Sequence, residues 1–355
     1  MTKLKKRSLK KTSVVDFATY LGVTVLFVVM YSLQSSGSLT RSLSGLLIPI
    51  CCYMSMAVSL NLTVGILGEL SLGHAGFMSV GAFSGIPSAG LRLAIAMVVG
   101  AIFAAIVGFL VGAPVLRLQG DYLAIVTLAF GEIIKELMNC LIVGVDERGM
   151  HLLFNLTGSK TADDLHLSET GTAIIKGAQG AVGIKTISTF TAGFVLVMVT
   201  LFVVLNLVRS RQGRAIMAIR DNEIAAQSIG LHVTSYKLMA FVTSAALAGA
   251  AGALYGLNYS SLQATKFNFN TSILILVFVV LGGLGNIWGS LVAAAALTIL
   301  PEALRGMDDL RMLIYSIVLI LVMLATNAPS MKAFFSRVQA AFGKKSHEGG
   351  KGNAV

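Results

Sequence analysis

Long apolar runs separated by short polar connections constrain the fold of this sequence more than any other feature. Of its 355 residues, 55% are hydrophobic and only 12% are charged, whereas a water-soluble domain of this size carries about 25% charged residues. A helix needs about 20 mainly apolar residues to cross the ~30 Å hydrocarbon core of a bilayer, because its backbone groups must bond within the segment. The sequence therefore predicts an all-α integral membrane protein.

About ten segments approach the required length, which predicts a polytopic helical bundle. The expected spans are residues 16–33, 42–64, 74–90, 93–115, 121–143, 189–208, 237–258, 271–286, 289–304 and 312–326. The third, eighth and ninth spans are short and rich in glycine. If the bundle contains tilted, re-entrant or broken helices, we expect them at these three spans. The spans define a transmembrane domain at 16–328 between basic tails at 1–15 and 329–355. The first apolar run lacks a small-residue cleavage site, so we expect it to be retained.

The formal net charge of +11 is concentrated at the ends of the apolar runs. That distribution favours membrane orientation over nucleic-acid binding, which requires a basic stripe on a suitable fold. An even number of spans places both termini on one side of the membrane. If that side is the cytoplasm, the cytoplasmic segments hold 17 of the 27 Lys and Arg residues and the outer segments hold nine. The sequence thus predicts a multi-pass protein with both termini in the cytoplasm.

Two long polar segments interrupt the spans, one on each predicted side. The outer segment, 144–188, is rich in glycine and charge, which is typical of an exposed cap or a flexible loop. The cytoplasmic segment, 209–236, has apolar residues near helical spacing and predicts one or two short helices parallel to the membrane. The residues of that apolar face are Ala215, Ile216, Ile219, Ala226 and Ile229.

Glycines four residues apart let helices approach closely and gain van der Waals contact inside a membrane. Such pairs recur along the chain and together predict a tightly packed bundle. The pairs are Gly81 with Gly85, Gly108 with Gly112, Gly252 with Gly256, and Gly285 with Gly289.

The residue constellations of common enzymes are missing from this sequence. No GxxxxGK[ST] loop occurs, so we expect no ATP site of that type on this chain. The five histidines are scattered, and the adjacent Cys51 and Cys52 match no metal or disulfide pattern. We therefore expect a transport protein with no catalytic residue, bound metal or cofactor of its own.

Polar residues at membrane depth are costly unless they meet a partner or water. Glu132, Lys135 and Glu136 share one face of the fifth span, and Asn139 lies one turn further along. This stripe is consistent either with a neutralised face that docks a neighbouring helix or with a wall of the solute path.

A second polar group falls in the glycine-rich junction between the second and third spans. Its members are Glu69, Ser71 and His74. The group is consistent either with a turn at the inner interface or with a gate.

Several strings together carry a resemblance to a known family. GELSLGHAGF begins at Gly68, LQGDY begins at Leu118 and TLAFGEI begins at Thr127. AIRDNEIAA begins at Ala218, GGLG begins at Gly282, and PEALR begins at Pro301. Over roughly residues 42–326 the chain resembles the permease family of branched-chain amino acid ABC importers, and it is most similar to the M-type subunit.

The resemblance implies a bacterial inner-membrane complex of several chains. Its parts would be this permease, a second permease of the H type, two cytoplasmic ATPase subunits that hold ATP and magnesium, and a periplasmic protein that delivers leucine, isoleucine, valine or a related solute. It also implies that a short helix of segment 209–236 seats in a groove of the ATPase. The residues that match this coupling pattern are Arg220, Asp221, Asn222, Glu223, Ala225, Ala226 and Gly230.

Two departures from the family pattern leave the solute open. Glu69 stands where the family usually has glutamine, and the outer loop is long. Related permeases carry urea, amides or other amino acids. Glu69, Glu132 and Lys135 also keep an ion-coupled secondary transporter as an alternative, although the two halves of the chain show no clear repeat. A membrane enzyme is disfavoured by the missing constellations, and a helix held only by anionic lipid is the alternative for segment 209–236.

Overall fold

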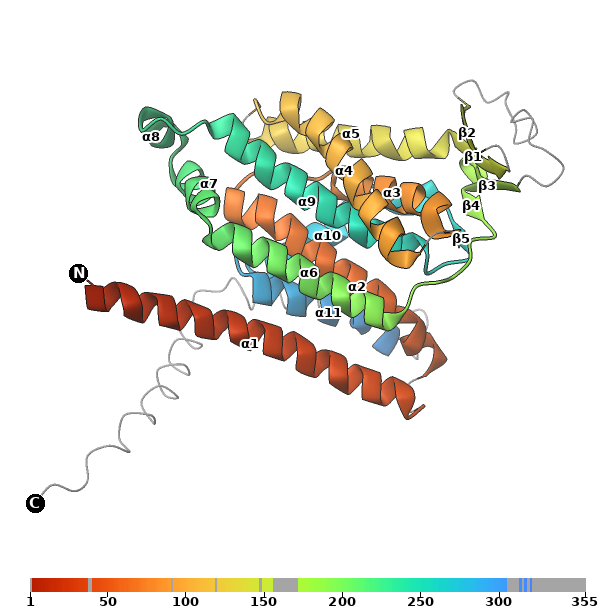
Figure 1. Cartoon of the computed structure of the whole chain (residues 1–355), viewed down its shortest axis with the longest axis horizontal. Coiled ribbons are helices and arrows are strands. Elements are labelled where there is room, and N and C mark those ends of the chain that lie inside the picture. The colour runs from red at the N-terminus through yellow and green to blue at the C-terminus, as the bar shows by residue number, and fades with distance from the viewer. Residues whose placement is uncertain are drawn as a thin grey trace, which may run out of the picture. The chain divides into compact units, whose positions relative to one another are not determined.

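Helices that run between two opposite ends dominate residues 1–299 of this computed structural model (Figure 1). The structure describes residues 2–37, 40–90, 92–118, 120–146, 149–155, 172–304, 313–314, 316–317 and 320. Residues 1–299 form one compact unit and residues 300–355 form another. Most of the tenth expected span, 312–326, and the whole basic tail at 329–355 lie outside the described residues.

The α-helices differ widely in length, and one of them continues directly into a π-helical turn named η1. The helices are α1 (Thr2–Ser35), α2 (Arg41–Asn61), η1 (Leu62–Leu67), α3 (His74–Gly85), α4 (Leu93–Val115), α5 (Asp121–Asn139), α6 (Phe190–Arg209), α7 (Arg211–Asp221), α8 (Glu223–Ser228), α9 (Val233–Gly256), α10 (Phe269–Gly282) and α11 (Ile287–Ala303). Short 3₁₀ turns occur at Pro87–Gly90, Gly177–Gln179 and Ala264–Phe267.

Four described helical segments are long and apolar enough to cross a membrane: Ser42–Leu67, Leu93–Val115, Phe190–Arg209 and Val233–Gly256. Shorter apolar helices cover Thr19–Ser35, Phe269–Gly282 and Ile287–Ala303. The predicted third span is only 12 residues long as α3, or about 18 Å at 1.5 Å per residue. The predominantly helical character and four of the apolar spans are therefore confirmed by length and composition, while the number ten stays a prediction.

The expectation of an all-α protein is wrong at the outer loop. A five-stranded sheet of order β2-β1-β3-β4-β5 forms there, and all of its pairs are antiparallel. The strands are β1 (Leu141–Asp146), β2 (Gly149–Phe154), β3 (Thr172–Lys176), β4 (Ala181–Val182) and β5 (Ser261–Leu262). Helix α5 consequently ends at Asn139, and the last residues of the expected fifth span belong to β1. Because β5 comes from the connection between α9 and α10, the sheet ties two distant loops together.

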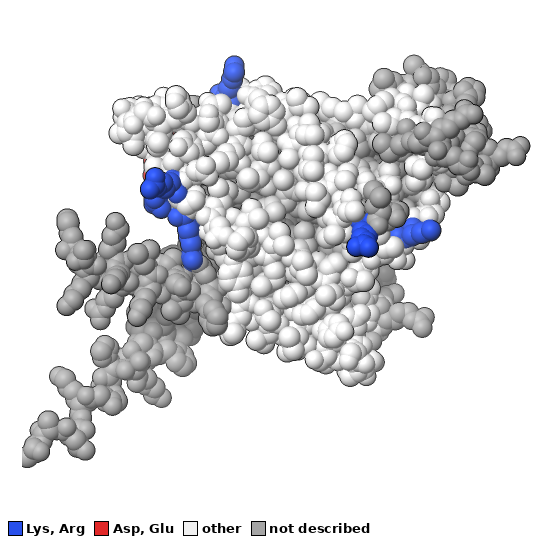
Figure 2. All heavy atoms as spheres, viewed as in Figure 1, with Lys and Arg blue, Asp and Glu red and all other residues white. Residues whose placement is uncertain are grey.

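The sheet and the short helices α7 and α8 lie at opposite ends of the bundle (Figure 1). Helix α6 connects them directly, because it begins after β4 and ends where α7 begins. On the face shown in Figure 2, Lys and Arg lie toward the edges of the described surface and its broad middle is uncharged. This distribution is the one expected of a surface whose middle contacts acyl chains.

Small residues let α9 pack closely against α3 and α4. A Cβ added to Gly81 of α3 would lie 2.0 Å from the carbonyl oxygen of Gly249 in α9, and one added to Gly100 of α4 would lie 2.9 Å from the Cβ of Ala253. Contacts this close require glycine, since any side chain would displace a neighbouring backbone. They make α9 the most buried of the four long apolar segments.

The remaining three predicted glycine pairs occupy two different kinds of place. Gly108 and Gly112 lie on α4 against Ala245 and Phe241 of α9. Gly252 and Gly256 lie on α9 against Met78 and Ala82 of α3. Gly285, with φ +79°, lies in the turn between α10 and α11, and Gly289 lies in the first turn of α11 against the carbonyl oxygen of Gly282. The last pair therefore closes a tight connection and does not form a crossing between two long helices.

Gly252→Ala and Gly256→Ala test this packing as a matched pair on one helix. A Cβ at position 252 would lie 2.0 Å from the Met78 carbonyl oxygen, whereas one at position 256 would lie 3.3 Å from the nearest atom, the Cβ of Ala82. We expect Gly252→Ala to lower the free energy of unfolding by about 1–3 kcal/mol, the usual cost of overpacking, and Gly256→Ala to lower it by less. Thermal unfolding of the detergent-purified proteins measures the difference, and equal losses would contradict this packing.

Candidate functional site

Helices α7 and α8 occupy the segment predicted to contact the ATPase, and a side chain caps the N-terminus of each helix. The Ser210 hydroxyl accepts a hydrogen bond from Gly213 N at the start of α7, and Asn222 Oδ1 accepts one from Ala225 N at 3.0 Å at the start of α8. Gly230, with φ +85°, follows α8 and donates its N–H to Gln227 O. Asn222 and Gly230 therefore have defined local roles as the N-terminal cap of α8 and the turn that ends it.

The apolar side of the α7–α8 unit is shorter than the sequence pattern predicts. Ile219, Ala226 and Val233 are buried together and join α7, α8 and the start of α9. Ile229, expected on the same face, is 75% exposed, and Ile224 is 80% exposed. The reason is that Asn222 has extended backbone angles, which end α7 and break the helical period. The break leaves two large apolar side chains in contact with solvent.

Arg220 connects α7 to the end of the second span. Its Nη1 donates a hydrogen bond to the carbonyl oxygen of Gly65 in η1 at 3.2 Å, and its guanidinium pairs with Asp221 at 3.0 Å. Its aliphatic stem packs over Gly68, where an added Cβ would lie 2.6 Å from Arg220 Cγ. The last carbonyls of a helix lack partners within it, so Arg220 supplies one from the neighbouring short helix.

Lys237, in the second turn of α9, joins the Glu69 junction to the predicted coupling residue Glu223, which the sequence suggested separately. Its Nζ lies 2.6 Å from Glu69 Oε1 and 3.1 Å from Glu223 Oε2. The residue is 2% exposed. Buried charges persist in proteins when they are paired. One ammonium group thus links the junction after η1, the start of α8 and helix α9. We name Lys237, Glu69 and Glu223 the Lys237 triad.

The segment from Gly68 to Gly73 is not helical and is held by side chains of surrounding helices. Leu72 N donates to Thr127 Oγ1 of α5 at 3.1 Å, and Ala75 N donates to Ser272 Oγ of α10 at 3.1 Å. Gly73 faces the backbone of Thr127 so closely that an added Cβ would lie 2.2 Å from its carbonyl oxygen. Non-helical backbone at membrane depth is tolerated where protein groups satisfy it in this way.

His74 and Ser71 lie at the end of that segment and are both buried. His74 Nε2 and Ser59 Oγ are 2.8 Å apart, and Ser244 of α9 donates to the Ser59 carbonyl oxygen at 2.6 Å. Ser71 Oγ has no hydrogen-bond partner in the described part of the chain. The three predicted residues of the junction therefore differ: Glu69 is in an ion pair, His74 is hydrogen-bonded and Ser71 is unpartnered.

The polar stripe of α5 docks a neighbouring helix at one of its residues. Glu132 Oε1 accepts the backbone N–H of Phe269, the first residue of α10, at 2.9 Å, and its other oxygen binds Lys135. Lys135 also pairs with Glu136 at 3.2 Å, and Asn139 donates to Glu136 at 3.3 Å. The Glu136 side chain is 61% exposed. Glu132 thus has a packing role, while Glu136 faces outward from the described chain.

Three features of the candidate site were missed by reasoning from the sequence. Lys237 was assigned to the end of a span, and its partner Glu69 is 168 residues away. Asn61 was not singled out, yet its Oδ1 accepts Gly285 N at 2.9 Å and its Nδ2 donates to Ser290 at 3.0 Å. The exposure of Ile224 also escaped notice. Asn61 could have been found from the sequence, because it is a polar residue inside an apolar run.

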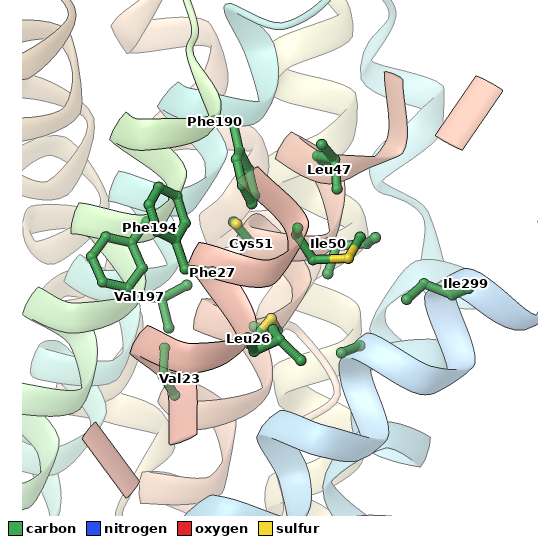
Figure 3. A pocket seen from close by; sticks show the side chains of 13 residues that line it. Val23, Leu26, Phe27, Leu47, Ile50, Cys51, Phe190, Phe194, Val197 and Ile299 are labelled. Carbon is green, nitrogen blue, oxygen red and sulfur yellow. The ribbon is translucent and has the colours of Figure 1, made fainter. Parts of the chain in front are cut away.

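One cavity of the described chain lies between α1, α2, α6 and α11, and none of these polar residues lines it. It measures about 60 Å³ and is lined by apolar side chains of α1, α2, α6 and α11, among them Phe27, Ile50 and Phe194 (Figure 3). Such a lining offers no partner for the charged groups of an amino acid. Among the described residues, no group of three or more His, Cys, Asp or Glu could hold a metal ion.

Comparison with known proteins identifies the family. A family described as branched-chain amino acid transport system / permease component matches residues 42–324. The chain is 36% identical over 281 residues to the high-affinity branched-chain amino acid transport system permease protein LivM of Escherichia coli strain K12, and 35% identical to LivM of Salmonella typhimurium strain LT2.

Each of these matches covers 77% of this chain and 66% of the relative, so the chain spans just under two thirds of the length of these relatives. No solved structure matches it. The family match extends from the start of α2 through the described end of α11 and includes both polar groups and the α7–α8 unit. The chain belongs to the family of branched-chain amino acid transport system permease components.

Proposed function

We propose that this chain is a non-catalytic permease subunit of an ATP-driven importer for branched-chain amino acids in the bacterial inner membrane. It works with a second permease of the H type, two cytoplasmic ATPase subunits that bind ATP and magnesium, and an extracytoplasmic protein that delivers the solute. The membership of a permease family supports a transport role over an enzymatic one. The names of the relatives support leucine, isoleucine or valine as the solute class.

The observation that carries this proposal is the exposed apolar tip of the α7–α8 unit. Ile224 and Ile229 are 80% and 75% exposed at one end of the bundle (Figure 1). Large apolar side chains on a short capped helix fit a groove on a partner protein, where they would be buried. Arg220 and Glu223 contact the transmembrane part from the same unit. Movement of an ATPase bound at this tip would therefore be passed to η1 through Arg220 and to α9 through Glu223.

The proposed solute path uses the non-helical segment 69–73 and the exposed face of α5. Interrupted helices at membrane depth supply polar backbone groups to transported solutes. Ser71 brings an unpartnered hydroxyl to this segment, and Glu136 brings an outward-facing carboxylate on α5. A half-exposed carboxylate on a membrane helix is more stable against water or a polar partner than against lipid. Both features support a path along this side of the chain.

The proposed topology keeps α7 and α8 in the cytoplasm and the five-stranded sheet outside. The domain spans 16–328, the outer loop spans 144–188, the coupling loop spans 209–236, and the tails at 1–15 and 329–355 are cytoplasmic. The excess of Lys and Arg on that side supports the arrangement. The sheet then stands on the side from which a binding protein delivers solute.

Uptake by reconstituted vesicles tests the proposed function. Vesicles that contain the assembled complex should take up labelled leucine when ATP is supplied inside and binding protein outside. Ile224→Asp and Ile229→Asp should each abolish most of that uptake and weaken binding of the ATPase subunits, because a charge replaces the side chain expected to enter the groove. Co-purification of the ATPase with each variant gives the second measurement.

Leu118→Asp is the matched control for this experiment. Leu118 is also an exposed apolar residue, in the connection between α4 and α5 at the same end of the bundle. We expect it to retain ATPase binding and uptake. Uptake by this chain alone in response to an ion gradient would overturn the proposal in favour of a secondary transporter.

Glu132→Ala and Glu136→Ala separate packing from transport on α5. Glu132 accepts the Phe269 N–H and binds Lys135, so its loss should lower the free energy of unfolding by about 1–3 kcal/mol. Glu136 makes exposed contacts, so its loss should cost less than about 1 kcal/mol and should instead reduce uptake by the folded complex. Thermal unfolding and vesicle uptake of both variants check this, and the opposite order of stability would contradict it.

A further inference from the structure

Three charged side chains from separate elements meet in the Lys237 triad, and their arrangement suggests how movement at α8 reaches the membrane. We propose that Lys237 is a positioning residue that couples the place of α8 to the conformation of segment 69–73, an inference that rests on the proposed function. Glu223 begins α8, Glu69 begins the non-helical segment, and Lys237 lies between them on α9.

Lys237 lies on a helix that is largely buried. Helix α9 is buried along most of its length against α2, α3 and α4. The Lys237 side chain is 3% exposed, so water cannot replace a lost partner without rearrangement. The triad holds two carboxylates and one ammonium group, so either carboxylate alone neutralises Lys237. One carboxylate can therefore leave without creating an unpaired buried cation.

The two carboxylates are held unequally. Glu69 lies 2.6 Å from Nζ with its side chain 16% exposed, whereas Glu223 lies 3.1 Å away and is 30% exposed. Helix α8 is six residues long and buries only Ala226. Separating Glu223 from Lys237 thus disrupts less structure than separating Glu69 does. The geometry assigns Glu223 to the releasable contact and Glu69 to the retained one.

A shift of α8 would change how strongly Lys237 attracts Glu69, since the two carboxylates share one cation. Segment 69–73 is the part able to respond, because it is not helical and single hydrogen bonds hold it, from Glu69 N to Thr63 O and from Leu72 N to Thr127 Oγ1. Arg220 holds Gly65 on the other side of the junction. The α7–α8 unit is therefore linked to the chain on both sides of Gly68, directly at Gly65 and through Lys237 at Glu69.

The test compares solute molecules transported per ATP hydrolysed in vesicles that contain the complete complex. Glu223→Gln leaves the neutral pair of Lys237 and Glu69, so the protein should fold and assemble. We expect transport per ATP to fall roughly fivefold or more, the lower range of measured coupling between sites. Lys237→Met should cause a similar fall, the double variant should add little to either, and Lys237→Arg should restore much of the coupling.

Asp121→Asn is the control, since it removes an exposed carboxylate at the same end of the bundle and should leave the ratio unchanged. Normal coupling in an assembled Glu223→Gln complex, or losses that simply add in the double variant, would overturn the inference. If Lys237→Met fails to assemble, Glu223→Gln decides the question alone. Wild-type complex that shows no ATP-driven uptake would instead refute the proposed function itself.

Discussion

A single buried ammonium group joins the parts of this protein that need to act together. Lys237 has two carboxylate partners, one from the junction after the second span and one from the short helix at the end of the bundle. Burial excludes the water that would weaken these attractions. An unpaired charge there is strongly unfavourable, so Lys237 keeps at least one of its two carboxylate partners. In the proposed coupling, movement of the exposed tip at Ile224 therefore changes the ion pair that Lys237 makes with Glu69.

Close packing of small residues gives that ion cluster a fixed base. Gly81, Gly100 and Gly249 bring α3, α4 and α9 so close together that a single methyl group would meet backbone. Inside a membrane this contact supplies stability that the hydrophobic effect cannot, because acyl chains are as apolar as leucine. The Thr127 hydroxyl of α5 then bonds Leu72 N in the interrupted segment, and the Ser272 hydroxyl of α10 bonds Ala75 N just after it. Rigid helices around a non-helical segment confine conformational change to a few residues.

The sequence predicted those features that depend on neighbouring residues. The span at 93–115 matches α4 at both ends, because Arg92 and the polar residues after Val115 bound a continuous apolar run. The predicted end of the fifth span was wrong, since Leu141, Ile142 and Val143 are apolar, and the last two are β-branched, so that they suit a strand as well as a membrane helix. The sheet depends on pairing with β3 and β5, which no local pattern contains.

In the candidate site, too, the sequence predicted the features that depend on neighbouring residues and missed those that depend on distant ones. The caps of α7 and α8 follow from residue types within four positions of each other. The partnership of Glu69 with Lys237 depends on folding over 168 residues, so the sequence could place both charges near the cytoplasmic end but could not join them. Glu132 illustrates a third case, because the sequence left packing and transport open and only the position of Phe269 N shows the packing contact.

The most direct measurement is the reactivity of a thiol placed in the interrupted segment by Ser71→Cys. Ser71 is 2% exposed, the native Cys51 and Cys52 are buried, and Cys140 can be replaced by serine. In the assembled complex, a water-soluble maleimide should label position 71 slowly without nucleotide and faster when ATP is bound. The acceleration should vanish when Lys237→Met is also present. Labelling that responds to ATP equally with and without Lys237 would contradict this account.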